Sequence, residues 1–348
     1  MDNRSLIDKL YKTSVLSRDE FTDLIESFTK NDLEYARSLA VETAKNVYGT
    51  SIYLRGLIEF TNICRMDCIY CGLRRSNSCA DRYRLDKSEI LDCCREGYAL
   101  GFRTFVLQGG EDPHYTDEII CDIVSSIKAE FPNCAVTLSI GERPKKSYQA
   151  FFDAGADRYL LRHESANSEH FSRLHPASQR LESRKECLYA LKEIGFQTGC
   201  GFMVGSPFQT ATCLADDLLF IHDLKPHMVG IGPFIPHKDT PFHDKEAGRL
   251  DLTLFMLALV RIMEKNVLLP ATTALGTINP LGREMGILSG ANVVMPNLSP
   301  RAVREKYMLY NNKICTGDEA AECRHCLENR VKKIGYDIEI SRGDFKEE

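Results

Sequence analysis

A regular alternation of short apolar runs and longer amphipathic segments dominates this chain from about Ile52 onward. The short runs have the length and composition of buried strands, and the segments between them repeat apolar residues at helical spacing. Eight such strand–helix repeats over roughly 250 residues predict an α/β protein with a complete (β/α)8 TIM-type barrel. An open doubly wound sheet is the alternative.

The apolar pattern also gives the bounds of the expected elements. The expected strands are Tyr53–Phe60, Thr104–Gln108, Ala135–Ile140, Arg158–Arg162, Gly199–Val204, Met228–Ile231, Leu268–Thr272 and Asn292–Met295. The expected helices are Lys87–Leu100, Thr116–Glu130, Lys146–Ala154, Ser168–Leu174, Leu181–Ile194, Thr210–Leu224, Leu252–Glu264 and Pro280–Leu288.

Three regions are expected in the 348 residues. Residues 1–50 form a helical extension, in which Ser17 to Glu20 resemble a capping box before an amphipathic helix. Residues 51–300 form the barrel. Residues 301–348 form a C-terminal extension that carries three further cysteines, and its charged end from Lys332 onward is expected to be a solvated tail.

Composition and charge exclude several classes of protein. The net charge of −5 and the lack of a basic run give no electrostatic reason to expect nucleic acid or an anionic membrane as a partner. No secretory signal and no stretch of membrane-spanning length are found in the sequence. The chain has 14 cysteines without a secretory context, which argues against a disulfide framework and predicts a cytoplasmic protein.

Cys64, Cys68 and Cys71 follow the first expected strand with the spacing C-x3-C-x2-C. Three thiolates on one short loop can each bind one iron of a 4Fe-4S cluster, which leaves the fourth iron open for chemistry. Zinc is the alternative, but a structural zinc site needs four ligands. The nearest candidate for a fourth ligand, Cys79, reaches this loop only if the intervening turn folds back.

Other polar residues follow the expected strands and therefore converge on the same barrel mouth. Gln108, Gly109, Gly110 and Glu111 come after the second strand, and Arg162 and Glu164 bracket the end of the fourth. Arg184 begins the next helix. Structural salt bridges and an ordinary glycine turn are the alternative explanations. Successive side chains of a strand point to opposite faces, so we expect the side chain of His163, between Arg162 and Glu164, to lie outside the barrel.

The cysteine spacing, with Tyr70 directly before the last cysteine, resembles that of the radical S-adenosylmethionine (SAM) superfamily. The resemblance implies an enzyme in which the open iron binds SAM and reductive cleavage yields a 5′-deoxyadenosyl radical. No catalytic side chain is then assigned beyond cluster and cofactor. It implies SAM contacts by Tyr70, Gln108, Gly109, Gly110, Glu111, Glu164, Arg184 and Ile231.

Four longer blocks, "RYLLRHESAN", "MVGIGPFIPHKDTP", "PATTALGTINPLGRE" and "GANVVMPN", resemble the HydE family of FeFe-hydrogenase maturases. This resemblance implies a small thiol-containing substrate, such as a cysteine-ligated iron carbonyl/cyanide complex. It also implies HydG, HydF and a reducing electron donor as partners. The implied substrate residues are Arg55, Thr137, Ser139, Arg162, Thr272, Thr273 and Tyr310, each of which could equally fill a barrel layer.

Two other functions stay open at this point. Methylornithine synthase and biotin synthase share the barrel and act on an amino acid or a vitamin precursor. A non-enzymatic iron–sulfur scaffold would bind a cluster without using SAM, although the glycine motif and the arginines at the mouth argue against it.

A second cysteine motif, Cys315, Cys323 and Cys326, lies near the C-terminus. It resembles the auxiliary cluster site that some HydE sequences carry, which implies a second 2Fe-2S or 4Fe-4S cluster away from the chemistry. A structural or adventitious metal, with His325 as a further ligand, is the alternative.

Overall fold

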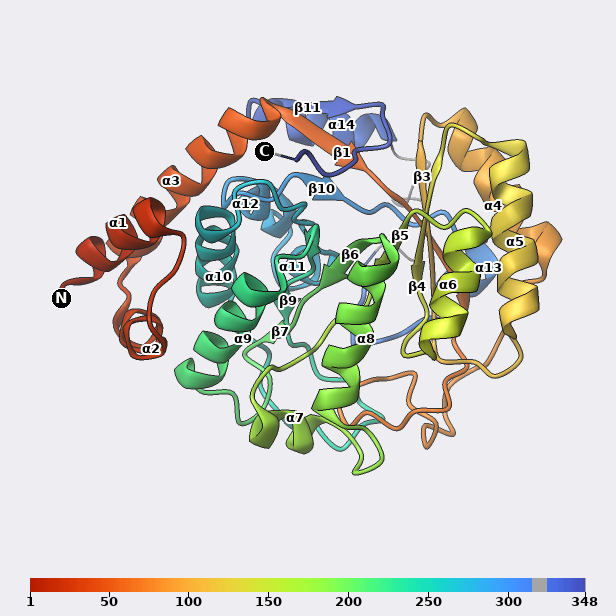
Figure 1. Ribbon diagram of the computed structural model, residues 1–348, viewed down its shortest axis with the longest axis horizontal. Coiled ribbons are helices and arrows are strands. Elements are labelled where there is room, and N and C mark those ends of the chain that lie inside the picture. The colour runs from red at the N-terminus through yellow and green to blue at the C-terminus, as the bar shows by residue number, and fades with distance from the viewer. Residues whose placement is uncertain (315–323, 348) are drawn as a thin grey trace.

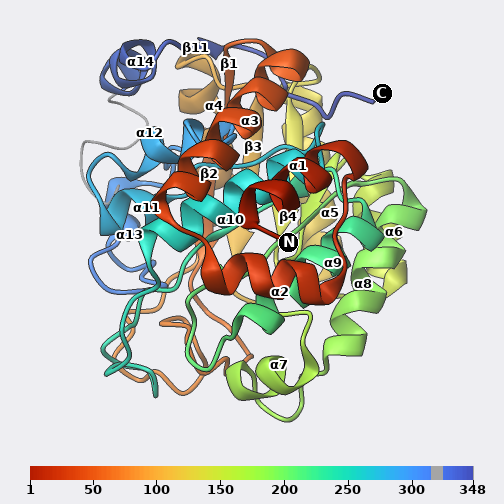
Figure 2. The ribbon, with the colours of Figure 1, turned by 90° about the vertical axis from the view of Figure 1, so that its left-hand side faces the viewer.

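The computed structural model describes residues 1–314 and 324–347, and three helices come first in the chain. They are α1 (Asn3–Thr13), α2 (Arg18–Ser27) and α3 (Lys30–Tyr48), and the expected capping box of Ser17 and Glu20 is present at the start of α2. The three helices lie across one side of the molecule (Figure 2), where α2 packs on α9 (Ala211–Leu224) and α3 on α10 (Leu250–Met263).

Six parallel strands form the main sheet, in the order β2 (Gly56–Thr61), β3 (Thr104–Gly109), β4 (Ala135–Ser139), β5 (Arg158–Leu160), β6 (Gln197–Cys200) and β8 (Met228–Val229). Every pair in this order is parallel. The α/β class with a parallel sheet, predicted from the alternating pattern, is therefore confirmed.

Hydrogen bonding continues beyond both edges of this sheet. Met228 forms a parallel bridge to Leu268, and Pro270 forms one to Val293. Val293 begins β10 (Val293–Val294), which pairs with β1 (Ser51–Leu54). The expected first strand is thus divided at Arg55: its first half, β1, pairs with β10, and its second half, β2, pairs with β3.

Helices α4 (Lys87–Ala99), α5 (Asp117–Glu130), α6 (Lys145–Asp153) and α8 (Leu181–Ile194) follow successive strands and pack against one another in that order (Figure 1). The remaining elements are α7 (Ser168–Leu174), β7 (Met203–Val204), β9 (Gly232–Pro233), α11 (Thr273–Ile278), α12 (Gly282–Ile287), α13 (Arg301–Arg304), α14 (Arg324–Lys333) and β11 (Asp337–Glu339). The expected strand Leu268–Thr272 forms only isolated bridges, and α11 directly after it was not expected.

The charged C-terminal end is not a solvated tail, and that expectation was wrong. β11 pairs with β1, and residues 342–346 then cross the N-terminal ends of the strands. There Arg158 at the start of β5 donates to Asp344 at 2.5 Å, and Thr104 at the start of β3 donates to the Arg342 carbonyl at 2.8 Å. We call residues 337–347 the C-terminal strap. Its Arg342 and Asp344 pair with polar and charged groups at the starts of the strands instead of facing water.

No helix in the described residues is both long enough and apolar enough to span a membrane.

Candidate active site

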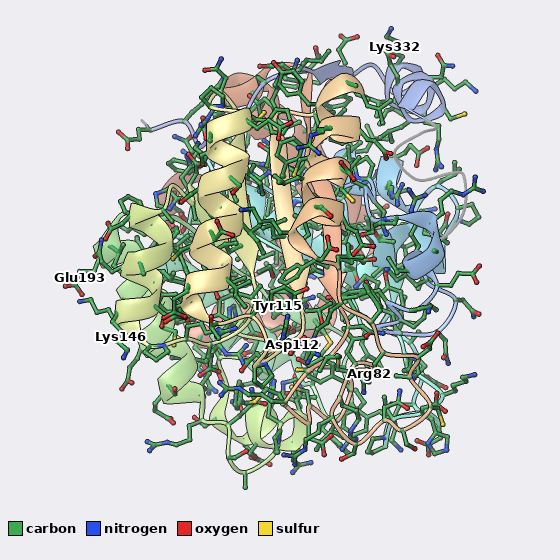
Figure 3. The ribbon with its side chains drawn as sticks, turned by 90° about the vertical axis from the view of Figure 1, so that its right-hand side faces the viewer. Arg82, Asp112, Tyr115, Lys146, Glu193 and Lys332 are labelled. Carbon is green, nitrogen blue, oxygen red and sulfur yellow. The ribbon has the colours of Figure 1, made fainter. Side chains whose placement is uncertain are left out.

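The cysteine loop joins the end of β2 to α4, and one arginine organises it. The Arg82 guanidinium donates to four backbone carbonyls of the loop: Asn62 (2.5 Å), Leu73 (2.9 Å), Arg74 (2.8 Å) and Asn77 (3.0 Å). Buried carbonyls need such donors because an irregular loop cannot satisfy them by its own ladder. Arg82 and Asp112 lie at the same end of the strands (Figure 3).

The three thiols of this loop are partly buried and close enough to affect one another. Burial, followed by the charge of Cys64, raises the pKa of Cys71 to about 12, and burial also raises the pKa values of Cys64 and Cys68. The free thiols are therefore protonated at neutral pH, and iron binding must release these protons.

Three free cysteine thiols on one loop are the donor set that a 4Fe-4S cluster with one open iron uses. Within residues 1–314 and 324–347, no three cysteine, histidine or carboxylate side chains converge to hold one ion. A cluster needs no such convergence, because each cysteine binds a different iron. Cys79, considered above as a fourth ligand, is exposed.

The glycine motif after β3 lies directly against the cysteine loop. A Cβ atom on Gly110 would lie 2.2 Å from the Ile63 carbonyl oxygen and 2.7 Å from the Cys64 Cβ. The backbone N–H of Glu111 also points at Cys64 Sγ, at 3.3 Å. The close approach that requires glycine at this position is therefore between two protein loops. This packing is separate from the SAM contact that the resemblance implies for Gly110.

Asp112, which directly follows the glycine motif, also holds the two loops together. Its carboxylate accepts from Thr61 Oγ1 at 2.8 Å and from Arg84 at 2.7 and 2.9 Å. Burial opposes its negative charge, but these hydrogen bonds prevail and lower the pKa of Asp112.

Several polar residues that were predicted to bind ligands are buried with unused hydrogen-bonding groups. Buried polar atoms in proteins are nearly always paired, so such a group of exceptions is informative. Among the described residues, the following buried atoms have no hydrogen-bond partner: Arg55 Nε and Nη2, Thr137 Oγ1, Arg162 Nε and Nη2, Glu164 Oε2 and Thr272 Oγ1. They belong to β4 and to segments at β1, β5 and Leu268–Thr272, so residues distant in sequence carry buried donors and acceptors that no described residue pairs by a hydrogen bond.

Two of these atoms, Arg162 Nη2 and Glu164 Oε2, lie 3.1 Å apart and form an ion pair, although they are not aligned for a hydrogen bond. Arg184, in contrast, is held by the protein itself, because it donates to Glu142 at 2.6 Å and to the Arg162 carbonyl at 2.7 Å. Its guanidinium therefore supports the backbone of Arg162 in addition to any role toward a ligand.

The other predicted ligand residues lie in varied surroundings. Tyr70 is half-buried, with its ring edge-on to His175, and Gln108 donates to the Tyr307 hydroxyl at 3.3 Å. Ile231 is fully buried, whereas Ser139, Thr273 and Tyr310 are half-buried. Cys315 and Cys323 lie outside the described residues, and Cys326 lies on α14.

Sequence reasoning missed a buried ion pair next to this site. Glu59 on β2 binds Lys313 at 2.6 Å and accepts from Asn297 at 2.9 Å. The pair ties the strand that leads into the cysteine loop to the segment that precedes Cys315. A glutamate inside the apolar run from Ile52 to Phe60 was the signal that could have identified it.

Comparisons with known proteins agree with this fold and site. Residues 58–221 match the radical SAM superfamily, so the class of protein is a radical SAM enzyme, which uses a 4Fe-4S cluster and SAM. The FeFe hydrogenase maturase subunit HydE of Thermotoga maritima is 45% identical over 340 residues, which cover 96% of this chain and 95% of that protein. The chain belongs to the HydE family and is a HydE-like radical SAM hydrogenase maturase.

More distant relatives share the same fold. A 3-methylornithine synthase of Methanosarcina acetivorans is 25% identical over 290 residues, which cover 82% of this chain and 81% of that protein. The crystal structure of methylornithine synthase (PylB) superposes with a TM-score of 0.80 at 22% identity, over 96% of this chain and 97% of that one. At this level of identity the likeness concerns the fold alone.

Proposed function

We propose that Cys64, Cys68 and Cys71 bind the 4Fe-4S cluster and leave one iron open to SAM. When bound, cluster and SAM supply a 5′-deoxyadenosyl radical. The role of the chain is to hold the three thiolates at fixed positions, which Arg82 does through the loop carbonyls and Gly110 through close packing.

We propose that SAM contacts come from loops at the C-terminal ends of the strands. Glu164 is a largely buried carboxylate suited to accept from the ribose hydroxyls of the cofactor, and its Oε2 lies 3.1 Å from Arg162 Nη2 without an aligned hydrogen bond. The remaining proposed contacts are Tyr70, Gln108, Gly109, Gly110, Glu111, Arg184 and Ile231.

The proposed substrate is a small anionic, thiol-containing molecule, of which a cysteine-ligated iron carbonyl/cyanide complex is an example. The observation that carries this proposal is the buried Arg55, whose guanidinium contacts Met228 Sδ at 2.8 Å. A buried guanidinium needs negative charge nearby, and an anionic ligand would provide it. Further contacts are proposed for Thr137, Ser139, Arg162, Thr272, Thr273 and Tyr310.

Four further proposals concern the whole protein. The bridges at Leu268 and Pro270 support a complete barrel over residues 51–300, between helical and C-terminal extensions at 1–50 and 301–348. Cys315, Cys323 and Cys326 are proposed to bind a second iron–sulfur cluster. HydG, HydF and a reducing electron donor are the proposed partners in hydrogenase maturation. The cytoplasm is the proposed compartment.

Anaerobic assays of Arg55→Met would test the substrate proposal. The reconstituted, reduced variant should still cleave SAM without substrate at the wild-type rate, because Arg55 is not among the proposed SAM contacts. In this variant, the increase in the rate of SAM cleavage caused by the iron carbonyl/cyanide substrate should be at least tenfold smaller than in wild type. Equal stimulation of variant and wild type would contradict the proposal, and stimulation by an ornithine or vitamin precursor instead would favour the alternative substrate class.

A further inference from the structure

A fully buried histidine–aspartate pair lies directly behind the proposed ligand residues Arg162 and Glu164. The side chains of His163 and Asp217 are both 0% exposed, with 3.2 Å between Nε2 and Oδ1. Asp217 lies on α9, and the His163 ring packs edge-on against Phe220 of the same helix at 4.9 Å between centroids. His163 therefore points away from the ring of strands and toward the helix, as its alternation with its neighbours predicted.

The same histidine also holds the neighbouring strand segment. The backbone N–H of Gly201 donates to His163 Nδ1 at 3.3 Å, and the N–H of Glu164 donates back to the Gly201 carbonyl at 3.0 Å. Burial lowers the pKa of His163 to about 3, so its ring is neutral at physiological pH. With Nδ1 accepting, the proton lies on Nε2, the atom that faces Asp217.

Asp217 extends this clamp past Glu164. Its Oδ1 accepts from the backbone N–H of Ala166 at 2.5 Å and lies 3.2 Å from His163 Nε2, without an aligned hydrogen bond to that atom. One carboxyl group, whose pKa is raised by burial, therefore touches the chain on both sides of Glu164. The two contacts restrain the direction in which the segment leaves β5.

Glu164 needs such restraint because its backbone is strained. Its φ of +64° lies in the left-handed region, which is unfavourable for a residue other than glycine and persists only where neighbours enforce it. Side chains alternate along extended backbone, so fixing His163 on the outer side directs Arg162 inward. The direction of Glu164 depends instead on its left-handed backbone, which the contacts of Gly201 and Asp217 hold in place.

We propose that His163 and Asp217 are positioning residues, which hold Arg162 and Glu164 in the inward conformation that binds SAM and substrate. This inference rests on the proposed function, in which Glu164 contacts SAM. The pair does not touch the ligands itself. It acts through the backbone between Arg162 and Ala166.

The test titrates SAM into reconstituted, reduced enzyme and follows the change in the EPR spectrum of the cluster. His163→Phe keeps the ring packing but removes both polar ends, and it should raise the half-saturating SAM concentration at least tenfold at unchanged iron content. His163→Asn keeps an acceptor for Gly201 but cannot reach Asp217, and it should raise that concentration by about three- to tenfold. His227→Phe is the matched control, because His227 Nδ1 accepts from the Thr198 N–H at 3.0 Å at the opposite end of the strands.

The Glu164→Gln variant distinguishes a failure of the proposed SAM contact of Glu164 from a failure of the positioning role of His163. If Glu164→Gln leaves SAM binding unchanged, the proposed role of Glu164 fails and this inference fails with it. If Glu164→Gln weakens binding while both His163 variants bind SAM like wild type, only the positioning role is overturned. Should His163→Phe not fold, His163→Asn decides the question alone. A loss of thermal stability without a change in SAM binding would likewise overturn the proposal.

Discussion

Gln179 shows how one side chain can serve two states of the cysteine loop. The Cys68 thiol donates to Gln179 Oε1 at 3.3 Å, and Gln179 Nε2 has no hydrogen-bond partner among residues 1–314 and 324–347. An iron-bound thiolate carries no proton and can only accept. A rotated amide would then donate from Nε2 to the sulfur.

Gln179→Leu should therefore lower the reduction potential of the cluster, since hydrogen bonds to the sulfurs stabilise the more negative, reduced state. Redox titration followed by EPR measures this shift. Gln149→Leu, on the exposed side of α6, is the control and should leave the potential unchanged. An unchanged potential in Gln179→Leu would refute the proposed hydrogen bond.

Gly110→Ala tests the close packing of the glycine motif on the cysteine loop. The new Cβ would overlap the Ile63 carbonyl, and backbone must move to make room. We expect a loss of about 1–3 kcal/mol in the free energy of unfolding, together with reduced iron content after reconstitution. Gly230→Ala is the control, because its Cβ would meet no atom closer than 3.8 Å. Wild-type stability and iron content in Gly110→Ala would be incompatible with the packing described here.

At the scale of elements, the cysteine loop is an irregular segment held by one cation. Arg82→Lys keeps the charge but cannot reach four carbonyls at once. We expect this variant to lose about 2–4 kcal/mol of stability and to release iron faster to a chelator. Chemical denaturation and the time course of iron release measure the two effects.

Arg75→Lys is the matched control for Arg82→Lys, because Arg75 lies on the same loop and is exposed. It should behave like wild type in both measurements. Equal iron release from the two variants would show that Arg82 does not organise the loop.

The elements themselves were largely predictable from local pattern. The helices α4, α5, α8 and α9 lie within one or two residues of their expected bounds, because their apolar spacing and capping residues are local properties. The division of the first strand at Arg55 was not predictable, since it depends on which strand each half meets. The same holds for Leu268–Thr272, which has only isolated bridges to its neighbours.

At the scale of the whole molecule, the C-terminal strap joins the last residues to the starts of strands β3, β5 and β6. Asp344 accepts from Arg158, Arg342 and Gln197. Burial alone would raise the pKa of Asp344, but the hydrogen bond from Arg342 and the charge of Arg158 lower it below the ordinary value.

A lowered pKa in the folded state means that the ionised form of Asp344 stabilises the fold above the ordinary aspartate pKa of about 4. This contribution disappears as the pH falls below that value. Asp344→Asn should therefore reduce stability by about 1 kcal/mol at pH 7, a figure that allows for the partial exposure of the side chain. The difference from wild type should narrow between pH 4 and pH 2, as measured by denaturant unfolding.

Asp337→Asn, at an exposed position of β11, is the control for the strap and should match wild type at both pH values. A difference between Asp344→Asn and wild type that stays constant with pH would show that the charge of Asp344 is not the stabilising feature.

The sequence by itself determined the class of fold, the cysteine loop and the family, because strand and helix periodicity, cysteine spacing and long blocks of similar sequence are all written along the chain. Only the tertiary structure determined which partners the charged side chains pair with. The reach of Arg82 to four carbonyls, the burial of Glu59 with Lys313, and the pairing of the strap with Arg158 join residues far apart in sequence. The residue type specifies a charge but not the partner of that charge. A charged segment such as the C-terminal strap can therefore pack against the N-terminal ends of the strands, although its sequence suggests a solvated tail.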